Sequence, residues 1–173
     1  HLLVGGCYNG LVSYFDTRKG EAPVDTSIIE KSHRDPVYKM AWLAGKTPTE
    51  CASTSTDGQV LWWDIRRLGE PSEYLSLDDK TEPGSVLGGC SMDYASAGKF
   101  LVGTEQGKIQ SCQRKGKTNA DKLSTLYEGH CGPVYGLQRN PWYPKFFLTT
   151  GDWTVRLWNE ELKAPIMTSK YFQ

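Results

Sequence analysis

A short motif recurs four times along the 173-residue chain, each time as a turn that leads into an alternating strand. The copies occupy residues 8–16, 56–64, 105–113 and 151–159, and their last residues are 48, 49 and 46 positions apart. A period of about 40–50 residues is typical of solenoids, propellers and related arrays. Residues that recur at this period are expected to build the framework, because chemistry is normally done at one site.

The composition is that of a chain with a packed core and no dominant charge. Hydrophobic residues make up 38% of the chain and aromatic residues 12%, while twenty basic and twenty acidic residues balance to a net charge of zero. No overall field therefore attracts the chain to nucleic acid or to an anionic membrane. No run of about 18 apolar residues is present that would span a bilayer.

The five cysteines favour a reducing, intracellular compartment. Their number is odd, and none of them forms a C-x-x-C pair. Most fall in or beside predicted strands, where cysteine behaves as a small hydrophobic residue. This usage argues against a disulfide framework and against zinc binding.

The second copy predicts four short strands within one period. They are expected at residues 37–43, 51–55, 60–63 and 72–77. Asp57-Gly58, between the second and third of these strands, is among the strongest short signals for a hairpin. No helical pattern interrupts the strands. Four short antiparallel strands per period describe one blade of a β-propeller, so the sequence predicts an all-β fold.

The other copies follow the same plan less completely. We expect a partial blade at residues 1–31, a complete blade at 32–84, a degenerate blade at 85–128 and a complete blade at 129–173, all in one propeller domain. Propellers close with about 4–8 blades. The chain therefore predicts about three and a half blades of a larger ring, with the remainder supplied by residues beyond this sequence.

Three residues of the second copy offer the chemistry of a hydrolase. His33, Ser55 and Asp57 are the residue types of a Ser–His–Asp triad. The fourth copy has matching residues at His130, Thr150 and Asp152. The recurrence favours a structural role over an active site, and an enzyme that uses His33 with Ser55 is the alternative.

The structural interpretation adds one tryptophan to each group. In this interpretation the histidine, the turn aspartate, a hydroxyl and the indole N–H of Trp63 or Trp158 form a buried chain of hydrogen bonds. Such a chain would satisfy polar groups between blades and fix their geometry.

The same residues resemble the WD-repeat family. The resemblance rests on His33, Asp57 and Trp63-Asp64 in the second copy, and on Gly129-His130, Asp152 and Trp158-Asn159 in the fourth. It implies a seven-bladed propeller, of which this chain supplies about half, and a scaffold role. The third copy departs from the family pattern with Gln106 and Cys112, and the first with Asn9 and Phe15. These two blades are expected to depend on apolar packing.

Longer stretches resemble the dynein intermediate chains. They include residues 55–64, 102–107 and 151–158, and the most specific element is Asp152-Trp153-Thr154, since most WD repeats have glycine where Trp153 lies. Within that family, residues 5–10 and the pair Trp62-Trp63 are most similar to the smaller intermediate chain of axonemal outer-arm dynein.

This resemblance implies a non-catalytic scaffold subunit of a dynein complex in the cytoplasm and cytoskeleton, at the axoneme of a cilium or flagellum. The implied partners are the dynein heavy chain, a second intermediate chain and, through the complex, the microtubule doublet. Light chains would bind extended segments outside the propeller. The resemblance implies no cofactor, metal, nucleic acid or membrane. An adaptor of another assembly, such as cytoplasmic dynein, a ubiquitin ligase or a transport complex, is the alternative.

Two turns carry aromatic residues that are candidates for partner binding. Trp153 lies in a predicted two-residue turn, from which it either anchors a partner or folds back over a neighbouring blade. Trp142 and Tyr143 lie between two prolines at the opposite rim, where they either bind a partner or pack under the loop.

A basic loop supplies the remaining candidates. Arg114, Lys115 and Lys117 follow a third strand, as either a solvated linker or a contact with an acidic partner surface. Because the loop has no interleaved aromatic residues for base stacking, nucleic acid is not its expected partner.

Overall fold

Four antiparallel sheets follow one another in chain order in a computed structural model, which describes residues 1–43, 49–78, 84–95 and 98–170. The first sheet contains β1 (Leu2–Gly6), β2 (Val12–Asp16) and β3 (Asp25–Thr26). The second contains β4 (Val37–Trp42), β5 (Glu50–Ser55), β6 (Gln59–Asp64) and β7 (Glu73–Ser76). The third contains β8 (Gly89–Tyr94), β9 (Lys99–Thr104), β10 (Lys108–Gln113) and β11 (Leu123–Glu128). The fourth contains β12 (Gly136–Arg139), β13 (Phe146–Gly151), β14 (Thr154–Asn159) and β15 (Met167–Thr168).

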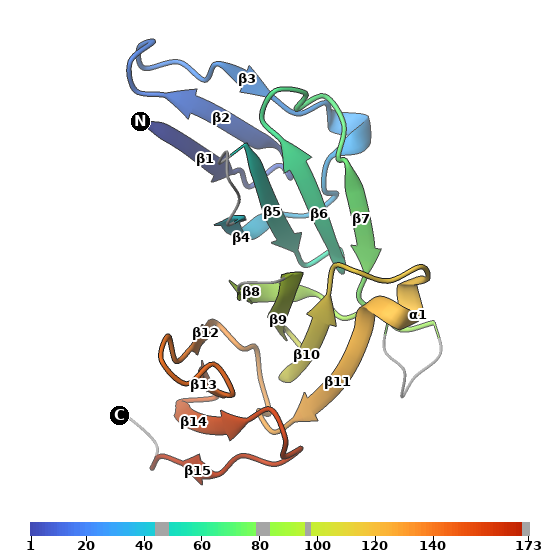
Figure 1. Ribbon diagram of the computed structural model, residues 1–173, viewed down its shortest axis with the longest axis vertical. Helices are drawn as coiled ribbons and strands as arrows, with labels where there is room; N and C mark the ends of the chain where they lie inside the picture. The colour runs from blue at the N-terminus through green and yellow to red at the C-terminus, as the bar shows by residue number, and fades with distance from the viewer. Residues whose placement is uncertain (44–48, 79–83, 96–97, 171–173) are drawn as a thin grey trace.

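The sheets stack as the blades of a propeller. Figure 1 shows a curved row from the blue first sheet to the red fourth, with β4, β8 and β12 along one side of the row and β7 and β11 along the other. The first strands of neighbouring sheets touch, β4 against β8 and β8 against β12. The predicted all-β propeller architecture is confirmed, including a first sheet that lacks one strand.

The second sheet is buried on both faces because it lies between two others. Trp63 packs toward the first sheet with Val12 and Leu68. Trp62, its neighbour in the sequence, points to the other face and packs with Phe100 of the third sheet. Successive residues of a strand point to opposite faces, so a Trp-Trp pair supplies a large side chain to each of two interfaces.

The expectation of no helix is wrong at two short segments. The connection after β10 forms α1 (Asn119–Lys122), and a single 3-10 turn, η1, covers Ile29–Lys31. Thr118 caps α1 in a capping box with Asp121, which satisfies backbone N–H groups at the start of the turn. None of the helices in the described part of the chain is long and apolar enough to cross a membrane.

Candidate functional site

His33 is the centre of a buried polar network in the second sheet. It precedes β4, and its ring Nδ1 donates to the carboxylate of Asp57 at 3.0 Å. Its Nε2 lies 2.7 Å from the hydroxyl of Ser53, and the indole N–H of Trp63 donates to that same hydroxyl at 2.8 Å. The network runs from the hairpin turn through the histidine to the tryptophan of β6.

The fourth sheet contains the same network with threonine in place of serine. The Nδ1 atom of His130 donates to Asp152 at 2.8 Å, and its Nε2 lies 2.7 Å from the hydroxyl of Thr149. Trp158 donates its indole N–H to Thr149 at 2.8 Å. The two histidines are almost fully buried, so both ring nitrogens must find partners inside the protein.

The hydroxyl predicted for each network is wrong. Ser55 donates to the carbonyl of Asp35 instead, and Thr150 is exposed. In β5 the hydroxyl that reaches the ring of His33 belongs to Ser53, two residues further from the hairpin turn than Ser55. Ser53 pairs with Leu61 of β6, on the face of the sheet that also carries Trp63. In β13 alternation puts Thr150 on the other face from Thr149.

The arrangement has the connectivity of a catalytic triad without the access that catalysis needs. Ser53 has no exposed surface, and its hydroxyl already accepts the N–H of Trp63. A nucleophile must lie within reach of a substrate carbonyl, with donors placed for the oxyanion. Ser53 lies instead in the packed interior with no surface open to a substrate.

Both turn aspartates are held in the ionised form. Burial raises the pKa of Asp152, but hydrogen bonds from the Thr154 hydroxyl, the Cys131 N–H and His130 outweigh it and lower the pKa to about 2. Burial likewise raises the pKa of Asp57, and donors led by His33 bring it below its ordinary value. An ionised carboxylate accepts these donors more strongly than a neutral acid would.

Arg114, a candidate for partner binding, is partly buried and paired with carboxylates of the chain itself. Its guanidinium donates to Glu50 at 2.7 Å and pairs with Glu73 at 2.8 Å, both in the second sheet. It also lies over the ring of Trp62, 5.7 Å from the centroid. Arg114 directly follows β10, and its two carboxylate partners lie in the second sheet, so the guanidinium connects the two sheets. Lys115 and Lys117 are exposed on the same loop.

Trp142 and Tyr143 project from a well-anchored loop between β12 and β13. Their side chains are 83% and 68% exposed. The side-chain carbonyl of Asn140 accepts both of their backbone N–H groups, at 2.9 and 3.0 Å. Arg139, itself paired with Glu160, donates to the carbonyl of Pro144. The loop therefore presents its aromatic side chains to solvent instead of packing over them.

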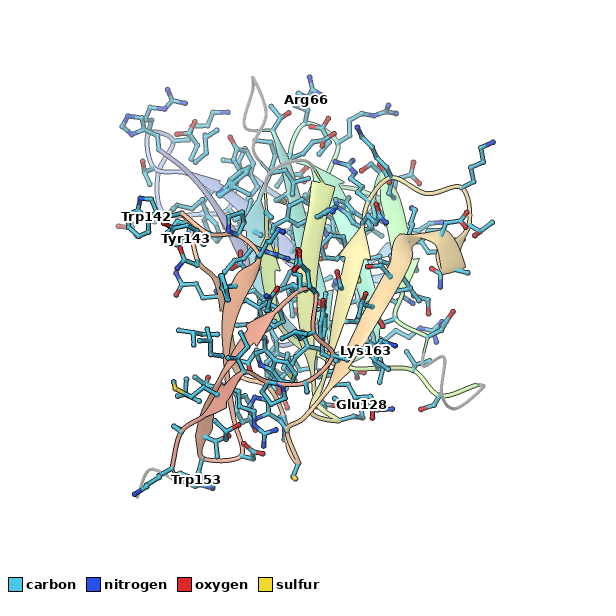
Figure 2. The ribbon with its side chains drawn as sticks, turned by 60° about the horizontal axis from the view of Figure 1, so that its bottom comes forward. Arg66, Glu128, Trp142, Tyr143, Trp153 and Lys163 are labelled. Carbon is cyan, nitrogen blue, oxygen red and sulfur yellow. The ribbon has the colours of Figure 1, made fainter. Side chains whose placement is uncertain are left out.

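Trp153 lies at the other end of β13. It is 77% exposed and does not fold back over a neighbouring sheet. Figure 2 shows it at the lower extremity of the molecule, far from Trp142 and Tyr143. The candidate aromatic residues thus divide between two opposite rims, while none of the described residues form a cluster suited to a metal ion.

Sequence reasoning missed the partners that come from distant strands. Ser53 and Thr149 were detectable from the hairpin pairing. Trp63 pairs with Cys51 and Trp158 with Phe147, and the hydroxyl residue follows two positions later on the same face of the sheet. Glu50 and Glu73 were not detectable as partners of Arg114, since only the stacking of sheets brings them together.

Known proteins resemble the chain in sequence and in fold. Residues 90–173 match the family model described as the dynein axonemal intermediate chain 3 WD40 domain. Dynein intermediate chain 3, ciliary, of Heliocidaris crassispina is 55% identical over 99% of this chain and 30% of its own length. The 70 kDa intermediate chain of the flagellar outer arm of Chlamydomonas reinhardtii is 50% identical over 99% of this chain and 31% of its own length. The chain thus spans less than a third of these relatives.

A solved structure supports the fold alone. One chain in the crystal structure of the mitotic checkpoint complex superposes with a TM-score of 0.74 at 19% identity, over 97% of this chain and 49% of that one.

Proposed function

This WD-repeat chain is related along its full length to the axonemal dynein intermediate chains, and we propose that it acts as a non-catalytic scaffold in a dynein motor complex of cilia or flagella. The observation that carries the proposal is 50% identity, over 99% of the chain, to an intermediate chain of the flagellar outer arm. On this basis the chain resides at the axoneme and functions in the outer arm.

The chemistry of the buried residues supports a scaffold role. His33, Asp57, His130 and Asp152 direct their polar atoms at other groups of the chain. A scaffold needs a rigid framework and exposed anchors, and satisfied polar networks supply rigidity. Its contribution to the motor is placement: it holds other subunits at fixed distances and angles.

The partners in this proposal are the heavy-chain tail and a second intermediate chain. Docking on the microtubule doublet follows through the complex, and light chains bind segments outside these sheets. Exposed tryptophan and tyrosine are enriched at the energetic centres of interfaces. Trp142 and Tyr143 on one rim and Trp153 on the other suit a disc that is bound from two sides, and Lys115 and Lys117 suit an acidic neighbour.

Co-purification tests the proposal. The tagged full chain, expressed in ciliated cells, is expected to be recovered with dynein heavy chain in axonemal extracts. The control is a tagged WD-repeat protein of unrelated sequence from the same cells. Recovery without any heavy chain, or with a ubiquitin ligase or transport complex instead, would overturn the motor assignment and favour an adaptor of another assembly.

The absence of catalysis is tested at the buried hydroxyl. Ser53→Ala is expected to leave any esterase or peptidase turnover of the full chain at its background level, because no substrate reaches Ser53. Ser55→Ala is the matched control in the same strand. A turnover that is present in the wild type and abolished by either variant would show that the site is an enzyme.

A further inference from the structure

The outer edges of the four sheets differ in how readily they could accept a further strand. β3 and β15, the outer strands of the first and fourth sheets, have two residues each. β11, the outer strand of the third sheet, pairs with β10 through a register shift. β7, the outer strand of the second sheet, has four residues in unbroken register with β6. Short or interrupted edges resist pairing with another chain, so β7 is the edge best suited to it.

The backbone groups of Tyr74 in β7 point away from the sheet. The N–H of Leu77 donates back to the carbonyl of Gly58 in the hairpin, whereas the N–H of Ser76 donates outward to the side chain of Asn119. Successive residues of an antiparallel strand direct their N–H and C=O groups alternately toward and away from the paired strand. Tyr74, two residues before Ser76, therefore directs both groups to the outer side, where the described residues place no strand.

Asn119 shows what this edge accepts. Its side-chain amide takes the N–H of Ser76 at 3.1 Å and donates to the carbonyl of Ser76 at 2.9 Å. The backbone of an added strand would make the same two kinds of bond. Figure 1 shows α1, which carries Asn119, against the end of β7. The amide therefore closes the edge at Ser76 and leaves the next outward residue, Tyr74, open.

A cleft of about 350 Å³ lies beside the open residue. Ser72, Glu73 and Tyr74 form one wall, and Lys117 and Lys122 are part of the other. The first wall belongs to the second sheet and the other to the connection between β10 and β11 of the third. Both sheets have neighbours on each side within this chain, so a further sheet stacked on the first or the fourth would lie away from the cleft.

The charges of the cleft favour an acidic occupant. The carboxylate of Glu73 is already shared, because it pairs with Arg114 at 2.8 Å and with Lys122 at 3.6 Å. Lys117 is exposed and has no ion-pair partner in the part of the chain that the structure describes. An ammonium group binds most strongly to a carboxylate. The lining thus offers one positive charge to an incoming side chain.

We infer that the edge of β7 at Tyr74 binds an extended, acidic segment of a partner polypeptide, which adds a strand to the second sheet. The inference rests on the proposed scaffold function and assigns one of its surfaces. The segment accepts the N–H of Tyr74, donates to its carbonyl and places a carboxylate beside Lys117. In strand addition of this kind, main-chain hydrogen bonds supply affinity and the side chains supply specificity.

Carbodiimide coupling and hydrogen exchange test the inference in the native assembly that contains the full chain. The carbodiimide should join the amine of Lys117 to an aspartate or glutamate of another subunit, which mass spectrometry identifies. The amide of Tyr74 should exchange at least about tenfold more slowly in the assembly than in the purified chain, because it gains a hydrogen bond. Coupling of Lys117 only within its own chain, or to a second copy of it, would overturn the inference. An unchanged exchange rate would do the same.

Two variants of Tyr74 separate the backbone from the side chain. Tyr74→Pro removes the outward N–H, and proline is tolerated at an edge where that group faces solvent, so the melting temperature should be kept. The yield of the Lys117 coupling should fall about tenfold or more, because the added strand loses a donor. Tyr74→Ala keeps the N–H and should retain most of the coupling. Equal losses in the two variants would indicate a side-chain contact and overturn the added strand.

A charge reversal keeps the test decisive if Tyr74→Pro does not fold. Lys117→Glu changes an exposed residue and should remove most of the exchange protection of Tyr74 in the assembly. Full protection in that variant would overturn the acidic occupant. Lys115→Glu, on the same loop but outside the lining of the cleft, is the matched control and should keep the protection.

The outcomes also separate this inference from the proposed function. Recovery of heavy chain with the wild type, together with unchanged exchange at Tyr74, would overturn the added strand and leave the scaffold role intact. If the wild type is recovered without heavy chain, the motor assignment fails. The same coupling and exchange measurements on the complex that does contain the chain then decide the inference by themselves.

Discussion

A single hydroxyl holds the histidine and the tryptophan together in two of the four sheets. Thr149 connects His130 to Trp158, and Ser53 does the same for His33 and Trp63. Each hydroxyl satisfies two buried ring nitrogens at once. The stability of these sheets therefore depends on an atom that has no exposed surface.

Neighbouring threonines of β13 provide a matched test of this dependence. Thr149→Val keeps the shape of the side chain but leaves the Nε2 of His130 and the N–H of Trp158 without a partner. It should lower the free energy of unfolding by about 1–3 kcal/mol. Thr150→Val changes an exposed residue and should stay within about 0.5 kcal/mol. Urea unfolding of the full chain measures both, and equal effects would contradict the network.

The lowered pKa of Asp152, the turn aspartate of the fourth sheet, leads us to expect a loss of stability in acid. The pKa of Asp152 is lowered to about 2, below its ordinary value of 3.8. A lowered pKa means that the carboxylate contributes stability above its unfolded pKa, and that this contribution disappears as the pH falls from about 5 toward 2.

Removing the strongest donor should reduce that acid-dependent loss. In Thr154→Val the pKa of Asp152 should rise toward 3.8, so that the stability lost between about pH 5 and pH 2 becomes smaller. The carboxyl ¹³C shift of Asp152 measured during a titration reports the pKa directly. Titration of the wild-type residue at its ordinary value would refute the account.

At the scale of whole elements, the third sheet is held to the second by a different device. It has Cys112 at the place of the tryptophan and Gln106 at the place of the turn aspartate. Trp62 of the second sheet meets Phe100 edge-on, with ring centroids 5.7 Å apart, and donates its indole N–H to Tyr94 at 3.2 Å. Apolar packing was the expectation for this sheet, and an ionic cluster at Arg114 supplements it.

The ion pairs of Arg114 with Glu50 and Glu73 should stabilise the contact between the second and third sheets. Arg114→Met removes the hydrogen bonds to Glu50 and Glu73 while keeping much of the side-chain volume. It should cost about 1.5–3 kcal/mol, the range for hydrogen bonds to charged groups. Lys115→Met, the next residue and an exposed one, should change stability by less than about 0.5 kcal/mol. Thermal unfolding compares them, and a neutral Arg114→Met would mean that the cluster is a surface ion pair of little value.

At the scale of the whole molecule, the two outer faces of the stack carry apolar residues with no sheet against them. Leu148 and Met167 on the fourth sheet are 46% and 58% exposed, and Leu3 on the first is 56% exposed. A shallow cleft on the fourth sheet is lined by Phe146, Leu148 and Leu157, among others. Exposed apolar faces of this kind favour association.

These faces predict the behaviour of residues 1–173 on their own. The isolated chain should self-associate in solution through these faces, and size-exclusion chromatography with light scattering would detect this. Leu148→Lys combined with Met167→Lys should reduce the association. A sharp melting transition of a monomer would contradict the prediction.

The sequence by itself determined the repeat and the strands. Alternation, hairpin turns and a period near 48 residues are local properties of the chain, and they were sufficient to predict an all-β propeller. The recurrence of His33 and Asp57 as His130 and Asp152 also identified the buried networks, because repeated residues occupy equivalent places in repeated sheets.

Only the tertiary structure decided which partners those residues meet. Whether Ser53 or Ser55, and Thr149 or Thr150, meets the histidine depends on where strand pairing stops at each hairpin turn. Pairing continues to Gly151 and Thr154 in the fourth sheet but stops at Thr54 and Val60 in the second, so the turn of the fourth sheet is shorter. Arg114 reaches Glu50, 64 residues away in the sequence, only because two sheets stack. Contacts between sheets are set by packing across large sequence separations, which no local pattern encodes.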